Sequence, residues 1–589
     1  MSLLQCLKRS FARKNQFAKR LRRRLELEAL EDRTVPSASG QLLWTGPAGG
    51  SWSSSANWID PVNHKNYAPT STDQLLLDPA APLHGANTSG IINTSMTVDR
   101  VIMDSSYTAT VTVPSGITLS TTNYFQQYGT LAMVGTGTIT AGTYFNIYGA
   151  VTALSSGGAT AHLNTTGSFF LFTSGSITVL GGPAPPLSIT TGNFSDSGTI
   201  SVGTGAGPGN LTITGAFLQS AGATTLTTGS VLTFASGGSP SAYPIIQGST
   251  TTVTMSGATI STDTKLAISG ATLNCLTTAG NVIAGNLAVY NTGIINVGSP
   301  LTGTTAHPST LTLTTGSFTV GALDPNSGGT GGTLNLYTKS LVTFPPASGS
   351  STFVVKSLGV INMYGASIAM TPSRVAFLDI RAAEPGLSAG TLNSLSAPSI
   401  GVGDSVTGSI VCAGVINMGN GGTAATALAV SLPVTVSGAL NMSGATLTVP
   451  SLTLSGGTLT SQGGTGFGDT IMTPGGGGLT NNGMIQYSGA LHTLALAGAG
   501  AAYTQGTQGT LIFRVGNGSV NDVFTISGAA TLAGTLTITA VGTLTAGQMW
   551  DLILAGVGIT TDFTTKNFPA DGNPNWDAAS VGGIYFASN

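Results

Sequence analysis

Two carboxylates, Asp379 and Glu384, come closest to a catalytic pair by residue type and spacing. They lie in the most densely charged stretch of the body of the chain, together with Arg374, Arg381 and Asp404. Glycoside hydrolysis uses two carboxyl groups about 5 to 10 Å apart, one as proton donor and the other as base or nucleophile. A loop held by Arg–carboxylate pairs would have the same composition, and we favour this interpretation. We therefore expect no catalytic residues and keep Asp379 and Glu384 as the alternative.

Residues that commonly hold metals or cofactors are scattered along the chain. No histidine has a second histidine four residues away or a neighbouring cysteine, so the spacing of a metal site is missing. The glycine run at 473–478 lacks the Lys-Ser or Lys-Thr pair of a phosphate-binding loop. We expect neither a metal nor a cofactor. Cys275 and Cys412 are best interpreted as small buried core residues rather than as a disulfide.

Three of the five tryptophans, Trp44, Trp52 and Trp58, lie within 15 positions of one another. Each tryptophan can bury about 150 to 250 Å² of surface, so a cluster of them suits a cap over the open end of a stacked fold. The alternative is an aromatic surface platform that contacts carbohydrate. Because turn residues alternate with these tryptophans, we favour the cap.

Short strands with a period of two fill the centre of the chain. Segments such as 210–215, 309–316 and 439–449 alternate Leu, Ile, Val or Met with Thr, Asn or Ser, as half-buried strands do. A unit of Gly, a small or apolar residue, Ile or Leu, and a polar residue recurs, for example at 414 and 438. This spacing predicts turns of roughly 20 to 25 residues, within the range of solenoid repeats.

The composition favours a solenoid over a set of separate domains. Glycine accounts for 84 of 589 residues, and charged residues for 7% instead of the usual quarter or so. Glycine permits the tight corners of a coiled chain, and no linker interrupts residues 105–500. We predict an all-β fold, a parallel β-helix (β-solenoid) over 105–500. Some 18 to 20 turns at about 4.8 Å each would make a rod on the order of 90 Å long.

Charge is distributed unevenly along the chain. Residues 1–33 hold ten basic and four acidic residues, a net charge of +6, which leaves nine basic and 17 acidic residues, or −8, for the remainder. Binding to phosphates needs clustered Lys and Arg, so the body is not expected to bind nucleic acid. No apolar run of 18 residues occurs, and no transmembrane segment is predicted.

Residues 1–36 form a basic N-terminal segment, and 3–31 are predicted to be a short basic helix. The stretch 22–37, with the motif Leu-Glu-x-Leu-Glu-x-Arg-x-x-Pro complete from Leu27 to Pro36, resembles the N-terminal sorting segment of planctomycete extracellular proteins. This resemblance implies export to an extracellular or cell-surface location. The alternative is an amphipathic arm of an intracellular protein that binds anionic lipid or nucleic acid.

Two further stretches resemble autotransporter-type surface β-helix proteins. Residues 37–104, with their Trp-x-Gly and Asn-Trp motifs, are similar to the N-terminal cap segment of such repeat proteins, and residues 501–589 to the C-terminal turns and cap of their passenger domains. No membrane barrel follows within the sequence, so self-translocation is not implied.

Taken together, these features predict a secreted or cell-surface, adhesin-like structural protein that is not an enzyme. The expected partners are glycans, other surface proteins or further copies of the chain. The alternative function is a polysaccharide-acting β-helix enzyme, either a lyase or a hydrolase.

Overall fold

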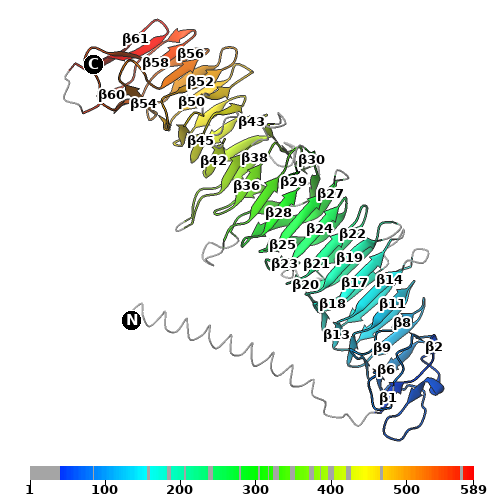
Figure 1. The fold of residues 1–589 in the computed structure, drawn as a ribbon. Coiled ribbons are helices and arrows are strands. Elements are labelled where there is room, and N and C mark those ends of the chain that lie inside the picture. Colours follow the sequence, from blue (N-terminus) through cyan, green and yellow to red (C-terminus); the bar gives the residue numbers. More distant parts are fainter. Residues whose placement is uncertain are drawn as a thin grey trace, which may run out of the picture.

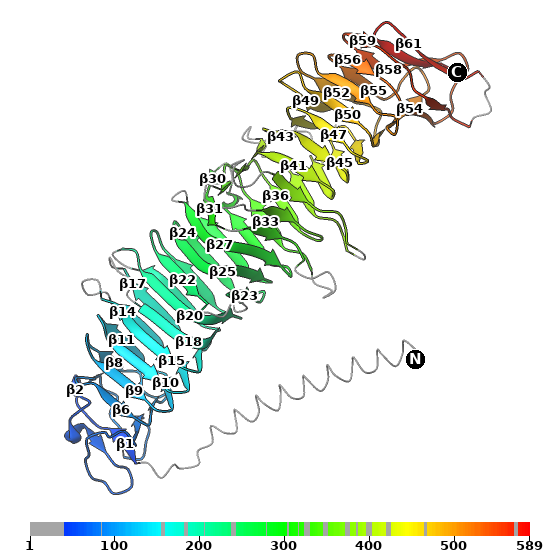
Figure 2. The same ribbon diagram turned by 180° about the vertical axis from the view of Figure 1, so that it is seen from behind.

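Successive turns of the chain stack on one another to build a long rod in the computed structural model, with the N-terminal turns at one end and the C-terminal turns at the other (Figures 1 and 2). The rod is a β-solenoid of about 17 turns with parallel sheets, which confirms the predicted fold class. The structure describes residues 40–588 except 84, 155–158, 182–186, 205–206, 237–242, 278–279, 303–304, 316, 323–329, 345–351, 371–376, 385–386, 396–402, 420–425, 465–467 and 571–574. The predicted N-terminal helix therefore lies outside the described residues.

Most turns of the rod contribute three strands, and in some turns the second and third strands merge into one long strand, such as β18 (Leu187–Asp196). In one early turn the three strands are β11 (Thr130–Val134), β12 (Thr138–Ala141) and β13 (Tyr144–Ile147). The next strand, β14 (Ala150–Leu154), returns to lie parallel on β11, with Val151 opposite Leu131. This turn takes 20 residues, and other turns are longer because loops are inserted at the corners. We call the sheet with one strand per turn sheet B, and the sheet with two strands per turn sheet A.

Sheet B runs nearly the whole length of the rod, and its register shifts where β17 pairs with β19, between Val179 and Leu180. Along its strands, side chains alternate between buried and half-buried positions, as the period of two predicts. Its main strands are β8 (Thr110–Val113), β11, β14, β17 (Ser176–Leu180), β19 (Thr199–Thr204), β21 (Ala223–Leu226), β24 (Thr252–Ser256), β26 (Thr272–Leu276), β28 (Ile294–Val297), β33 (Thr333–Leu336), β36 (Val360–Met363), β39 (Thr391–Ser394), β42 (Val415–Met418), β45 (Ala439–Met442), β48 (Thr458–Ser461), β51 (Met484–Tyr487), β54 (Thr510–Gly516) and β57 (Thr535–Val541).

The inward side chains stack as ladders of like residues. In the N-terminal half, one ladder consists of phenylalanines on successive turns of sheet A, with ring centroids 4.6 to 5.3 Å apart. Some of these pairs are stacked and others tilted, and both kinds add favourable ring contacts to the burial of apolar surface. The members of this ladder are Phe125, Phe145, Phe169, Phe194, Phe217 and Phe234.

Glycine allows the backbone of one turn to approach the next at the bend within sheet A. A Cβ atom added to Gly167 would lie 1.8 Å from the carbonyl oxygen of Thr143 on the preceding turn. A Cβ atom added to Gly215 would likewise collide with the carbonyl oxygen of Thr191, and Gly215 also has a φ of +126°. These two positions show a steric reason for the high glycine content that the sequence displays.

The N-terminal end of the core is closed by tryptophan. Trp44, Trp52 and Trp58 are each 0% exposed, and Trp58 packs edge-on against both of the others at 5.0 and 5.3 Å. The Nε1–H of Trp58 donates to the carbonyl of Trp52 at 2.8 Å. The three rings are buried together, as a cap requires, and none of them has an exposed face.

The C-terminal end is closed by an antiparallel arrangement of strands. β58 (Met549–Ala555) continues the parallel stack and also pairs with β62 (Ile584–Ser588), which in turn pairs with β61 (Asp577–Val581). Trp550 is buried beneath this layer, and its Nε1–H donates to the carbonyl of Gly516 at 2.9 Å. An antiparallel layer of this kind covers part of the last turn of the parallel stack.

Candidate functional site

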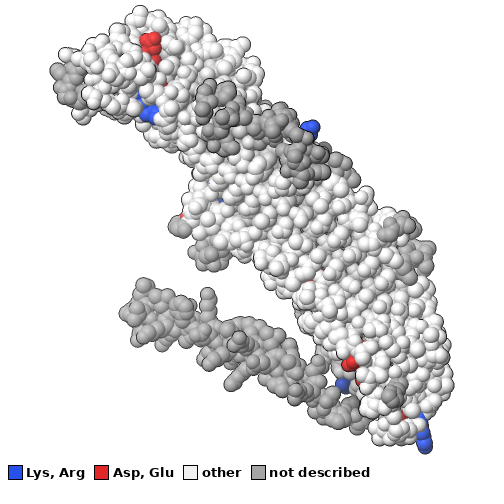
Figure 3. Space-filling view, in the orientation of Figure 1, with Lys and Arg blue, Asp and Glu red and all other residues white. Residues whose placement is uncertain are grey.

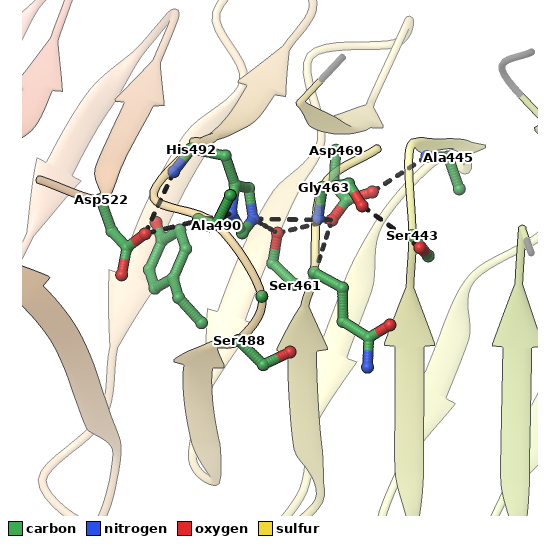
Figure 4. A network of polar contacts seen from close by, with 12 residues as sticks. Ser443, Ala445, Ser461, Gly463, Asp469, Ser488, Ala490, His492 and Asp522 are labelled. Atoms are coloured by element: carbon green, nitrogen blue, oxygen red, sulfur yellow. Dashed lines mark hydrogen bonds and ion pairs between the residues drawn. The ribbon is translucent and has the colours of Figure 1, made fainter. Parts of the chain in front are cut away.

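Among the described residues, a cluster of hydroxyl and ionisable side chains lies where the chain passes from sheet B to sheet A, between β48 and β55 (Val523–Ile526) (Figure 4). Ser461 ends β48, and Asp469 begins β49 (Asp469–Met472). His492 precedes β52 (Thr493–Ala497), and Asp522 precedes β55. The Ser461 Oγ lies 2.7 Å from His492 Nε2, so these residues show the residue types of a Ser–His–Asp triad.

The partners of these side chains differ from those in a catalytic triad. Ser461 donates its hydroxyl proton to Asp469 Oδ2 at 2.6 Å, while its Oγ also lies 2.7 Å from His492 Nε2. The other ring nitrogen, Nδ1, lies 2.8 Å from the carbonyl of Ala490, and Asp522 Oδ1 is 4.0 Å away. In a triad the histidine accepts the serine proton and a carboxylate orients Nδ1, whereas here the serine proton goes to Asp469 and a backbone carbonyl lies beside Nδ1. Ser461 is also 0% exposed, so no substrate reaches its hydroxyl.

Asp469 and Asp522, the two carboxylates of this cluster, link neighbouring turns through hydrogen bonds. Asp469 accepts from the backbone N–H groups of Ala445, Gln462 and Gly463 at 2.9 to 3.0 Å. Asp522 accepts from the backbone N–H of His492 on the preceding turn at 3.2 Å and from Arg514, whose Nε lies 2.7 Å from Oδ2. Buried carboxylates with this many donors stabilise the corner in which they lie.

Asp404, from the charged stretch identified in the sequence, has the same structural role. It is 2% exposed and begins β40 (Asp404–Thr407), where its Oδ1 accepts from the backbone N–H groups of Gly365 and Ala366. Ser394, the last residue of β39, donates to its Oδ2 at 2.8 Å. The pattern of a serine that ends a sheet B strand and a Gly-Asp that opens the next strand thus occurs twice, at Ser394 and Ser461. This repeated pattern was visible in the sequence and was missed.

The suggested catalytic carboxylates lie on another part of the surface. Asp379 points outward from β38 (Phe377–Ile380), and Arg381 Nε donates to its Oδ2 at 3.0 Å. Glu384 lies in the following loop, where its backbone N–H donates to Ser357 Oγ at 3.1 Å. Arg374 lies outside the described residues, and Asp404 is turned into the core. The Asp379–Arg381 contact is an ion pair of the kind that the loop interpretation expects, and a catalytic role for Asp379 and Glu384 stays a prediction.

A ladder of asparagines runs along the outer face of sheet B. Seven asparagines lie in register, and the Nδ2–H of each of the last six donates to the Oδ1 of the asparagine on the preceding turn at 2.8 to 3.0 Å. Its members are Asn274, Asn296, Asn335, Asn362, Asn393, Asn417 and Asn441. The ladder is half-buried, so its amides are open to solvent on one side.

Charge is sparse on the side of the rod that Figure 3 shows. The 16 sheet B strands from β8 to β51 contain no Asp, Glu, Lys, Arg or His. Within the described part of the chain, no group of three or more His, Cys, Asp or Glu side chains is placed to hold a metal ion. No helix among the described residues is long and apolar enough to cross a membrane.

Comparison with protein-family models and with curated proteins finds no match to this chain. The class of the protein is therefore defined by its fold, a parallel β-helix whose outer face along sheet B carries no charged residue from β8 to β51.

Proposed function

We propose that this chain is a secreted or cell-surface protein that acts as a structural or adhesive rod and catalyses no reaction. The observation that carries the proposal is the outer face of sheet B, which is free of charged residues over 16 successive strands. A long, flat and periodic face suits binding that is spread over many weak contacts. Acid–base chemistry on polysaccharides requires instead a few ionisable groups gathered at one point.

The burial of three aspartates supports a non-catalytic rod. Asp404, Asp469 and Asp522 are each at most 2% exposed and accept hydrogen bonds from neighbouring turns. They fix corners of the solenoid and are not available to a substrate. The competing function, a polysaccharide lyase or hydrolase, would depend on Asp379 and Glu384, and Asp379 pairs with Arg381 in the described structure.

Export is supported by the motif between Leu27 and Pro36. The test is limited proteolysis of intact cells that produce the protein, followed by mass spectrometry of the released peptides and of the mature N-terminus. We expect peptides from the rod to be released without lysis. Release only after lysis would show an intracellular protein and would overturn the proposed location.

A further inference from the structure

Three columns of outward side chains run side by side along the middle of sheet B. The central column is the asparagine ladder. On one side of it, two residues earlier on each strand, apolar and threonine side chains alternate, namely Ile294, Thr333, Val360, Thr391 and Val415. On the other side, directly after β33 and β36, lie Tyr337 and Tyr364. Adjacent columns are about 6.8 Å apart, and successive turns about 4.8 Å apart.

The amides of the central column retain free hydrogen-bonding capacity. Asn362 donates one N–H to Asn335 Oδ1 and accepts one from Asn393, at 2.9 and 2.8 Å. A primary amide has two N–H donors and two acceptor lone pairs, so one donor and one lone pair of each amide remain for a partner. The ladder therefore offers a donor and an acceptor at every turn.

The tyrosines give this strip an aromatic border. The rings of Tyr337 and Tyr364 are stacked, with centroids 5.5 Å apart and an interplanar angle of 11°. Both side chains are half-buried and point outward. Burial raises the pKa of Tyr337, and Tyr364 adds to this effect, so the phenol stays protonated and can donate a hydrogen bond.

The chemistry of the three columns defines the partner. A pyranose ring has apolar C–H faces and a rim of hydroxyl groups, which match an apolar or aromatic column beside a column of amides. The strip itself carries no charge that could pair with a polyanion, although Lys339 lies in the turn after Tyr337. A neutral polymer suits it better than an acidic polysaccharide or a nucleic acid, both of which need clustered cations.

We propose that the strip formed by Asn335, Asn362, Tyr337, Tyr364 and Val360 binds a neutral, hydroxyl-rich polysaccharide chain that lies along the rod. This inference rests on the proposed adhesive function and names its surface and its ligand class. The periodic amides bind hydroxyl groups along the glycan, and the flanking apolar and tyrosine columns contact its ring faces.

The test uses the full chain and two pairs of stacked tyrosines. Affinity electrophoresis in gels containing hydroxyethyl cellulose, galactomannan or alginate, and co-sedimentation with cellulose, measure binding. The strip variant combines Tyr337→Ala with Tyr364→Ala. The control combines Tyr124→Ala with Tyr144→Ala, a stacked outward pair at 5.0 Å on sheet A. A second strip variant, Asn335→Thr with Asn362→Thr, uses the residue that Thr254 and Thr460 supply in the same column.

We expect the wild-type protein to be retained by at least one neutral polysaccharide and not by alginate. Both strip variants should bind at least tenfold more weakly while keeping the wild-type circular dichroism spectrum, and the control should bind normally. Retention by alginate alone, no retention by any neutral polysaccharide, or equal loss in strip and control variants would overturn the inference. The inference would also be overturned if sedimentation velocity detected pairs of rods in the wild-type protein and none in the strip variants. The strip would then be a contact between two copies of the chain. Each of these failures leaves the location experiment on intact cells unaffected.

Discussion

Asn362 donates its Nδ2–H to Oδ1 of Asn335, 27 positions earlier in the chain, at 2.9 Å. The bond joins two consecutive turns on the outer face of sheet B and repeats along the ladder in one direction. It shows how this protein connects neighbouring turns without charge, because each side chain is both donor and acceptor. The ladder makes the surface stable and leaves it chemically neutral.

The first prediction concerns the replacement of one hydrogen-bond donor in the asparagine ladder by an acceptor. Asn393→Asp removes the donor to Asn362 Oδ1 and places two acceptors 2.8 Å apart. We expect the free energy of unfolding to fall by about 1 to 3 kcal/mol, which urea denaturation can measure. Asn393→Thr is the control and should cost less than about 1 kcal/mol, because threonine occupies this column elsewhere. Equal costs for the two variants would contradict a stabilising role for the ladder.

A second prediction compares a buried carboxylate with an exposed one. Asp469→Ala leaves the backbone N–H groups of Ala445, Gln462 and Gly463 without their acceptor in a buried corner. We expect a loss of about 3 to 5 kcal/mol. Asp379→Ala removes an exposed ion pair with Arg381 and should change stability by less than about 1 kcal/mol. Thermal unfolding of both variants measures the difference, and a similar shift in both would refute the structural role of Asp469.

The third prediction is a dependence of stability on pH that comes from Asp196. This side chain is 0% exposed, accepts from the backbone N–H of Gly198 at 2.8 Å, and has no hydrogen-bond partner for Oδ2 among the described residues. Burial raises its pKa from 3.8 to about 8. The folded state therefore holds this proton more tightly than the unfolded chain. The stability that the proton contributes is present below pH 4 and is lost as the pH rises through about 8.

Asp196→Asn should remove this dependence, because the amide keeps the acceptor for Gly198 and carries no charge. We expect the unfolding midpoint of the variant to exceed that of the wild type at pH 9, with a much smaller difference at pH 4. Unfolding scans of the wild type and the variant at several pH values measure these midpoints. An identical pH slope in the two proteins would show that Asp196 does not carry the effect.

A fourth prediction tests the close approach of backbones in sheet A. In Gly167→Ala the new Cβ would lie 1.8 Å from the carbonyl oxygen of Thr143, so the two turns must separate. We expect a loss of at least about 1 to 3 kcal/mol, the usual cost of overpacking. Gly475→Ala is the matched control, since no atom lies within 4 Å of its added Cβ. Normal stability of the Gly167 variant would mean that the turns are not packed as described.

The sequence predicted the solenoid well because its pattern is local and repeats. Apolar and polar residues alternate in segments such as 439–449, as they do on a half-buried strand. The structure places β45 and β46 (Ala445–Thr448) in that segment. The number of turns, about 17 against 18 to 20, was overestimated, because corner loops lengthen many turns. The spacing of 39 residues between Asn296 and Asn335 is an example.

The surface was harder to predict than the fold. Asp379 and Asp404 are close in sequence, yet one faces solvent and the other is buried at a corner, because strand register decides the face on which each side chain lies. The asparagine ladder is spread over 168 positions, from Asn274 to Asn441, and becomes a single feature only when the turns are aligned. The insertions between turns are irregular, so the sequence alone does not fix that alignment.

The central claim, that this rod binds without cleaving, is tested most directly by the length of polysaccharide chains after incubation with the protein. Neutral and acidic polysaccharides are incubated with the wild-type protein and with the Asp379→Asn and Glu384→Gln variants, and chain length is measured by size-exclusion chromatography. We predict that all chains keep their length with all three proteins. Shortening by the wild-type protein that either substitution abolishes would contradict the account and identify a catalytic site.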